Sequence, residues 1–482
     1  MAKNLSRREM LYCAGGLLSA AVAKGQTPAP ISPVMTRLST FMGAAAAANL
    51  PADVVEKTKH MILDTLAAMI SGSELPPGRF AINFARAYKG DGVATVAGSN
   101  VLCGPIEAAL ANGMLAHSDE TDDTHPPSQS HPGCATVPAA LAVGERFNIS
   151  GRHFLRAVTL GYDIGTRVTA TLGRLQYMFD THRSTHAIAG TFCAAAAAGC
   201  AASLNAQQMR WLLSYTAQQA SGTAAWQRDT DHIEKAFDFA GMPARNGVTA
   251  ALLVQAGGTG VGDIFSGADN FFDAFQPKNK PDMVIEKLGE RYEITRTNIK
   301  KWTVGSPIQA PLDALEILLK RYKFQPDQVK QIVVRDATNE AKIVDNREIP
   351  DICLQHMIAV MLIDKTASFK SAHDTARMKD PEILKQRAKV KLVGDEELEK
   401  LMPRRVGIVE VTLNDGMRFS ERVDNVRGTF ENPMPRDEVI VKARDLVTPV
   451  LGAATFTKLT DKVFDIENVK SVLELRPLLQ KV

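Results

Sequence analysis

The sequence is poor in cysteine, in aromatic residues and in long apolar runs. Its six cysteines are scattered and include no Cys-x-x-Cys pair, so neither a disulfide framework nor a cysteine zinc site is expected. Past the N-terminus, no stretch is long and apolar enough to predict a membrane-spanning helix. Aromatic residues make up 6%, the net charge is +3, and Lys and Arg form no run, which argues against nucleic-acid binding.

The remaining composition is that of an ordinary folded chain. Apolar residues make up 45% and charged residues 23% of the sequence, as in typical globular proteins. At 482 residues the chain exceeds the size at which a single core usually stops growing, so two domains are expected.

The N-terminus carries a targeting pattern. Ser6 to Leu11 reads SRREML, a twin-arginine pattern, and a short, weakly apolar run follows before Ala21-Val22-Ala23, a small-x-small cleavage site. We therefore expect residues 1–23 to be a twin-arginine-type signal peptide, and the mature protein to be periplasmic in a bacterium. The alternative is a frayed N-terminal helix.

The pattern of apolar residues changes along the chain. Residues 33–290 repeat apolar positions at helical spacing, as from Val54 to Met69. From 291 to 429 strand patterns appear, including a hairpin around Asn414-Asp415-Gly416. Residues 430–482 are again helical. The fold class is therefore mostly α, with a large all-helical domain of residues 33–290 and 430–482 and a smaller α+β lid domain of residues 291–429.

One segment concentrates titratable groups. Residues 117–131 read HSDETDDTHPPSQSH, with three histidines and four carboxylates. Carboxylates beside histidine suit proton transfer, because neighbouring charges move a pKa towards neutrality. The same side chains could bind a metal ion, with His117, Asp122, Asp123 and His131 as ligands. A solvated loop is the third interpretation. Residue types alone leave the acid/base site and the metal site equally supported.

Ordered motifs along nearly the whole chain resemble those of the MmgE/PrpD family. They are Asn112-Gly113 and Ala116-His117, Asp122-Asp123-Thr124, His131-Pro132, Ala189-Gly190-Thr191-Phe192, Gly258-x-Gly260, Leu354-Gln355-His356, and Arg427-Gly428. The family includes 2-methylcitrate dehydratase, cis-aconitate decarboxylase and iminodisuccinate epimerase. The resemblance implies a helical domain with an α+β lid, a homodimer, a carboxylate substrate bound between the domains, and no metal or organic cofactor.

The resemblance also implies roles for individual residues. It places the acid/base histidine on His131 and further catalytic groups on Glu120, Thr124, Lys235 and His356, the last in place of a tyrosine. Lys300, Asp123 and His186 would bind substrate, with His182 an alternative to His186. Lysines suit the oxygens of di- and tricarboxylates, and donors such as Thr124 stabilise the charge that builds on a carboxylate.

The sequence departs from the family pattern around the substrate. One extra residue separates Thr124 from His131, and Phe237-Asp238-Phe239 stands where the family has a histidine after Lys235. We expect a cofactor-independent lyase, first a dehydratase, that abstracts a proton next to a carboxylate. The alternatives are an epimerase or isomerase, a metal-dependent hydrolase built on segment 117–131, and a non-catalytic periplasmic binding protein.

Overall fold

The computed structural model describes residues 30–276, 278 and 280–481. The predicted signal peptide, residues 1–23, lies outside the described residues. Within the described part of the chain, no helix combines the length and the apolar character needed to cross a membrane.

A large helical body forms the first core. Its apolar side chains come from residues 35–299 and 434–479, together with Phe369. It contains α2 (Pro33–Ala44), α3 (Ala52–Gly72), α4 (Pro76–Ala87), α5 (Pro105–Ala116), α6 (Gly133–Phe147), α7 (Gly151–Ala170), α8 (Arg174–Thr181), α9 (Thr185–Ala201), α10 (Ala206–Gln219), α11 (Ile233–Ala236), α12 (Met242–Gln255) and α13 (Phe271–Phe275), with a two-stranded ribbon of β1 (Ala94–Thr95) and β2 (Leu102–Cys103).

Helix α9 lies at the centre of this body, and all 17 of its residues are buried. It packs against α6, α7, α10 and α12. Small side chains allow these helices to approach closely. A Cβ added to Gly165 of α7 would lie 2.4 Å from the backbone nitrogen of Cys193, and one added to Gly247 of α12 would lie 2.4 Å from that of Ala195. The alanine-rich sequence of α9 is thus a packing requirement.

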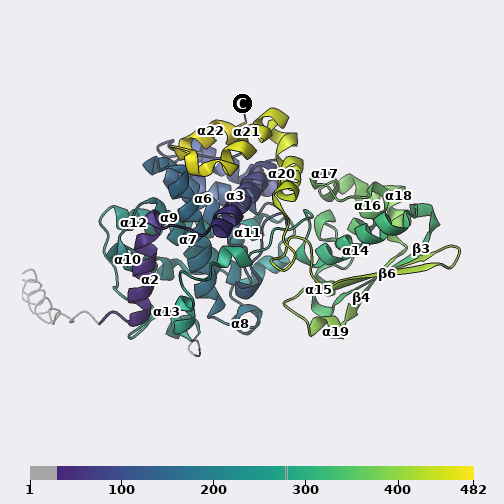
Figure 1. The fold of residues 1–482 in the computed structure, drawn as a ribbon, viewed down its shortest axis with the longest axis horizontal. Coiled ribbons are helices and arrows are strands. Elements are labelled where there is room, and N and C mark those ends of the chain that lie inside the picture. The colour runs from purple at the N-terminus through teal and green to yellow at the C-terminus, as the bar shows by residue number, and fades with distance from the viewer. Residues whose placement is uncertain (1–29, 277, 279, 482) are drawn as a thin grey trace, which may run out of the picture.

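A smaller α+β body, at the right of Figure 1, has its own core of residues 302–426. It contains α14 (Ser306–Tyr322), β3 (Val329–Ala337), α15 (Thr338–Val344), α16 (Leu354–Asp364), α17 (Phe369–Ala372), α18 (Pro381–Arg387), β4 (Val390–Asp395), α19 (Glu396–Glu399), β5 (Gly407–Leu413) and β6 (Arg418–Val423). The sheet order is β4-β3-β5-β6. Strands β3 and β4 are parallel, and the other two pairs are antiparallel. The mostly α class with a smaller α+β part is as predicted.

One local prediction is confirmed. Strands β5 and β6 form the expected hairpin, and Gly416 takes a φ of +91° in the turn between them, a conformation that favours glycine. The chain then returns to the helical body through α20 (Arg436–Leu451), α21 (Ala453–Phe464) and α22 (Arg476–Leu479), which lie over α3 and α6 at the top of Figure 1.

Candidate active site

The segment 117–131 lies inside the protein, so its interpretation as a solvated loop is wrong. Every residue from 117 to 125 is buried, and His131 keeps 8% exposure. The preceding helix α5 ends at Ala116 and α6 begins at Gly133, so the segment is held from both ends. Buried charges are costly unless they are paired, and the neighbours of this segment supply the partners.

Two buried lysines from distant parts of the chain bind the backbone of the segment. Lys442 of α20 donates to the carbonyl of Thr121 at 2.9 Å and pairs with Asp64 of α3 at 2.6 Å. Lys300, from the connection between the two bodies, donates to the carbonyl of Glu120 at 2.7 Å. Each ammonium therefore fixes the segment to another element. Lys442 is not a predicted site residue. Its only signal in the sequence is a lysine among the apolar positions of a helix.

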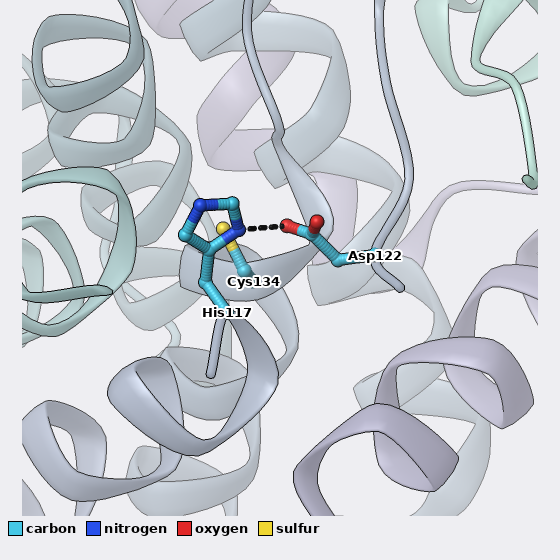
Figure 2. Close-up of side chains that lie close together, drawn as sticks. All are labelled: His117, Asp122 and Cys134. Carbon is cyan, nitrogen blue, oxygen red and sulfur yellow. Dashed lines mark hydrogen bonds and ion pairs between the residues drawn. The ribbon is translucent and has the colours of Figure 1, made fainter. Parts of the chain in front are cut away.

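Asp122 is the shared acceptor of two histidines. The Nδ1 of His117 lies 2.9 Å from Oδ2 of Asp122, and the Nδ1 of His131 lies 3.0 Å from Oδ1. Figure 2 shows the first of these contacts. The ammonium of Lys300 lies 3.7 Å from the same Oδ1. Because a carboxylate can only accept, both imidazoles donate through Nδ1, and in a neutral ring the lone pair is then on Nε2.

The pKa values of Asp122 and His131 indicate how each is protonated at neutral pH. Burial disfavours an ionised Asp122, but the two histidines that donate to it, His117 and His131, hold its pKa well below the usual value. Burial lowers the pKa of His131 to about 4, and the Asp122 carboxylate only partly offsets this. At neutral pH Asp122 is therefore an anion, and His131 is a neutral imidazole with a free Nε2.

Glu120 joins both predicted lysines to the same cluster. Its carboxylate forms a hydrogen-bonded ion pair with Lys235 and lies 3.6 Å from the ammonium of Lys300. Burial disfavours the charged form of Glu120, but these two cations hold its pKa well below the usual value. The structure thus brings Lys235 and Lys300, which are far away in the sequence, to Glu120 and His131 of segment 117–131.

A turn of π-helix, Phe237–Gly241, places the ring of Phe239 against the histidines of the cluster. Phe239 stacks on His186 with ring centroids 3.9 Å apart and on His117 at 4.4 Å. Trp226 meets Phe239 edge to face, and the ammonium of Lys235 lies about 5 Å from both rings. A π-turn accommodates one extra residue in a helix and is frequent at functional sites. This turn begins two residues after Lys235. It contains Phe237-Asp238-Phe239, where the sequence departs from the family pattern.

His186 lies within this cluster, at 5.2 Å from the ring of His131. Burial and the neighbouring histidines lower its pKa well below the usual value, so it is neutral. The alternative, His182, is exposed at the end of α8. The geometry therefore favours His186 over His182 as a site residue.

Asp123 faces away from His131, towards α7. Its oxygens accept hydrogen bonds from the hydroxyl of Tyr162 and the backbone amide of Gly133. Burial and the charge of Asp122 raise its pKa to about 7. Both oxygens are engaged within the protein, so these contacts give Asp123 a role in holding the segment. Its predicted role in substrate binding stays a prediction.

A cavity of about 240 Å³ between the two bodies reaches Thr124 and Lys300. Thr124 pairs through its backbone with Asn298, which also lines the cavity. Five arginines line the same cavity, Arg174, Arg296, Arg404, Arg405 and Arg427, together with the acidic residues Asp424 and Glu431. Four of these arginines form ion pairs with carboxylates, so the cavity has more cations than anions but most of its guanidinium groups are partnered. Lys300 therefore stands between a cation-lined cavity and the buried histidines.

The structure sets His356 apart from the cluster. It lies in α16, within the core of the smaller body, and is fully buried. Burial lowers its pKa to about 4, and the charged groups that act on it are Arg387, Arg377 and Asp374, all of the smaller body. Among the described residues neither of its ring nitrogens has a hydrogen-bond partner. A catalytic role for His356 stays a prediction that this placement does not support.

Another histidine of the smaller body does reach the segment. The Nε2 of His373 lies 3.1 Å from Asp119 and 4.0 Å from Asp351. Burial opposes protonation, but the hydrogen bond and charge of Asp119 raise the pKa of His373 to about 9. This ion pair connects the two bodies beside Glu120. The sequence offers no signal for it beyond an isolated histidine.

Two groups of potential metal ligands occur in the described part of the chain. One is His117, Asp122 and Cys134, drawn in Figure 2, and the other is His117, Glu120 and His232. In the first, His117 and Asp122 already bond to each other. Burial also raises the pKa of the Cys134 thiol well above its usual value, so its thiolate is disfavoured. In the second, the Nε2 atoms of His117 and His232 have no hydrogen-bond partner among the described residues.

A buried cluster of neutral imidazoles, anionic carboxylates and lysines next to a cation-lined cavity is the makeup of an enzyme site that transfers protons on anionic substrates. Comparison with known proteins gives the class. The MmgE/PrpD N-terminal domain matches residues 36–284, and the MmgE/PrpD C-terminal domain matches residues 302–466. The chain belongs to the MmgE/PrpD family, and it is a lyase-type enzyme.

The relatives cover almost the entire chain. The "cis-aconitate decarboxylase-like protein oryM" of Aspergillus oryzae is 25% identical over 93% of this chain and 98% of its own length. Cis-aconitate decarboxylase of Aspergillus terreus is 25% identical over 93% and 96%. The human cis-aconitate decarboxylase is 25% identical over 89% and 90%.

Proposed function

We propose that the protein is a lyase that removes a proton next to a carboxylate of a di- or tricarboxylate or hydroxy acid, with dehydration as the favoured reaction. The observation that carries this is the bond between Asp122 and His131. It fixes the imidazole proton on Nδ1 and leaves Nε2 as a base in a neutral ring.

The surrounding groups suit the charge that this step creates. When His131 takes the proton, negative charge moves onto the neighbouring carboxylate. Lys300 and Lys235 supply positive charge in a buried site, where solvent screens that charge only weakly. In dehydration the bond from the next carbon to its hydroxyl then breaks, and that oxygen leaves as water after receiving a proton. An ammonium of either lysine can donate it.

The cation-lined cavity supports an anionic substrate. A polycarboxylate in this cavity would have both the arginines and Lys300 among its neighbours. Guanidinium groups match the geometry of carboxylates. The side chain of Thr124, which lines the same cavity, can donate a hydrogen bond to a carboxylate oxygen.

Decarboxylation is the second candidate, because the relatives are cis-aconitate decarboxylases. Loss of carbon dioxide leaves a carbanion that must receive a proton, so His131 would have to enter the reaction protonated. Its lowered pKa disfavours that state and favours the base. Epimerisation shares the first step with dehydration and differs in returning a proton to the opposite face.

Proton NMR of the purified protein in D₂O tests the proposal. The protein is incubated with a panel that includes cis-aconitate, citrate-like acids and hydroxy acids, each with and without a chelator. A new alkene signal identifies dehydration, deuterium at a former C–H without an alkene identifies epimerisation, and loss of a carboxyl group identifies decarboxylation. The proposal expects turnover that the chelator leaves unchanged.

Variants separate the remaining alternatives. His131→Ala is expected to abolish turnover and keep the circular dichroism spectrum, whereas His182→Ala, at an exposed position, is expected to keep activity. Turnover that disappears with the chelator would point to the metal-dependent hydrolase. Binding of an acid without turnover, unaffected by His131→Ala, would point to a binding protein.

The proposal places this enzyme in the bacterial periplasm, because the N-terminal SRREML pattern is that of a twin-arginine signal. It includes a homodimer, expected from the family resemblance. Fractionation of cells that express the full chain, and sedimentation of the purified protein, test these two points.

A further inference from the structure

Two imidazole rings, those of His117 and His232, lie beside Glu120. The Nε2 atoms of His117 and His232 are buried, and among the described residues neither has a hydrogen-bond partner. The two ring centroids are 5.2 Å apart. One ligand atom from each ring and one carboxylate oxygen of Glu120 all lie within 4.8 Å of one another. Buried nitrogens without partners are rare, so this arrangement calls for an explanation.

The orientation of His117 is that of a metal ligand. Asp122 accepts the proton of Nδ1 at 2.9 Å, which leaves the lone pair of Nε2 pointing into the cluster. In proteins, a histidine that binds a metal through one nitrogen almost always donates its other N–H to a carboxylate or carbonyl. The hydrogen bond therefore both fixes the tautomer and aims the ring.

His232 also offers a lone pair. Burial and the nearby charge of Lys235 lower its pKa well below the usual value, so the ring is neutral at physiological pH. A metal ion needs neutral imidazole, and a protonated ring would repel it. His232 is three residues before Lys235 and outside the set of site residues predicted from the sequence.

The cation now paired with Glu120 is an ammonium. Lys235 forms a hydrogen-bonded ion pair with the Glu120 carboxylate. A metal ion held by His117 and His232 would need that same carboxylate. The ion and the Lys235 ammonium would therefore compete for one anion.

We propose that His117, His232 and Glu120 form a binding site for a divalent transition-metal ion of the zinc class, and that the bound ion inhibits the enzyme. Two imidazoles and one carboxylate are the ligand set of zinc, cobalt and nickel, whereas magnesium and calcium require oxygen ligands. Inhibition follows because the ion takes Glu120 from Lys235 and places a second cation beside Lys300. The inhibitory part rests on the function proposed above, and the metal site itself does not.

Metal binding is measured first, without reference to activity. The full chain is stripped with a chelator, dialysed, and titrated with ZnCl₂ by calorimetry and with CoCl₂ by visible absorption. We expect one ion per chain and cobalt absorption bands of a site with nitrogen ligands. Loss of a residue that only orients a ligand costs about 10- to 100-fold in metal affinity, so His232→Asn is expected to weaken binding by more than about 100-fold.

The chain offers a matched control for that variant. His182 shares the left-handed backbone of His232, with φ of +57° against +60°, and asparagine is well suited to that conformation. His182 is exposed, so His182→Asn should leave the affinity unchanged. Lys235→Met removes the competing ammonium and is expected to tighten zinc binding. Equal zinc affinity in the unmodified protein and in His232→Asn would overturn the site, and so would weaker binding in Lys235→Met.

The activity arm separates this proposal from the proposed function. With an acid that the enzyme turns over, zinc near its dissociation constant is expected to halve the rate, and a chelator to restore it. Zinc binding with no turnover of any acid would support the metal site and contradict the lyase proposal. Turnover that zinc leaves untouched at saturation would overturn the inhibition, and turnover that needs zinc would overturn both the inhibition and a metal-independent lyase.

Discussion

Replacing Asp122 by asparagine tests the central feature of the site. The carboxylate accepts from Nδ1 of His117 at 2.9 Å and from Nδ1 of His131 at 3.0 Å, and it is almost completely buried. Asparagine keeps the shape but presents one oxygen and one NH₂ group. The NH₂ group next to one histidine then favours the tautomer with its proton on Nε2. If that histidine is His131, the ring changes from a base to a donor.

The expected size of the effect follows from these contacts. One hydrogen bond to a charged group contributes about 1.5–3 kcal/mol, which corresponds to about 10- to 150-fold in rate. Loss of general-base action costs about 100- to 10,000-fold. Because the hydrogen bond acts through the base, the loss of base action sets the size of the effect. We therefore expect kcat to fall by about 100- to 10,000-fold, with little change in KM, since Lys300 and the cavity arginines remain.

The assay is turnover followed by proton NMR, beside thermal unfolding followed by circular dichroism. Asp263→Asn is the matched control, because Asp263 is a buried aspartate that accepts hydrogen bonds far from the cluster. The control is expected to lose stability and keep its kcat. If Asp122→Asn kept its kcat within about threefold of the unmodified enzyme, Asp122 would not orient the catalytic histidine, and the reasoning would be refuted.

Three further predictions concern protonation and buried charge. Because the pKa of His131 is lowered to about 4, kcat/KM should show no loss of activity near pH 6.5, and a pH–rate profile that falls through pH 6.5 would contradict this. His373 has a pKa raised to about 9 by Asp119. Its stabilisation is therefore fully present below about pH 6.5 and is lost as the pH rises through about 9. The difference in Tm between the unmodified protein and His373→Gln should shrink over that range, and a constant difference would show that the ion pair is not responsible. Lys442→Met should cost about 3–5 kcal/mol in urea unfolding, because it leaves the Asp64 carboxylate buried without its partner, and a second change, Asp64→Asn, should restore most of the loss.

Much of the fold could be predicted from local patterns. The apolar spacing from Val54 to Met69 falls within α3, and the turn Asn414-Asp415-Gly416 joins β5 and β6 as expected. These predictions succeed because helix periodicity and turn chemistry act over a few residues. The small residues of α9 likewise indicate a buried helix before its neighbours are known.

The candidate site could be predicted only in part. Residue types identified segment 117–131, and the family resemblance added Lys235 and Lys300, which the structure brings to Glu120. His356 fits the same resemblance, yet it lies in the core of the smaller body, and among the described residues its ring nitrogens have no hydrogen-bond partner. A motif fixes a position in the chain, and the packing of α16 decides which way the side chain faces.

The sequence by itself determined the helical pattern, the change to an α+β segment and the presence of a titratable segment between α5 and α6. Only the tertiary structure decided that this segment is buried, that Asp122 is shared by two histidines, and that His117, His232 and Glu120 lie together. The physical reason is that protonation and reactivity depend on burial and on charges within a few ångströms, and here those charges come from residues more than 100 positions apart.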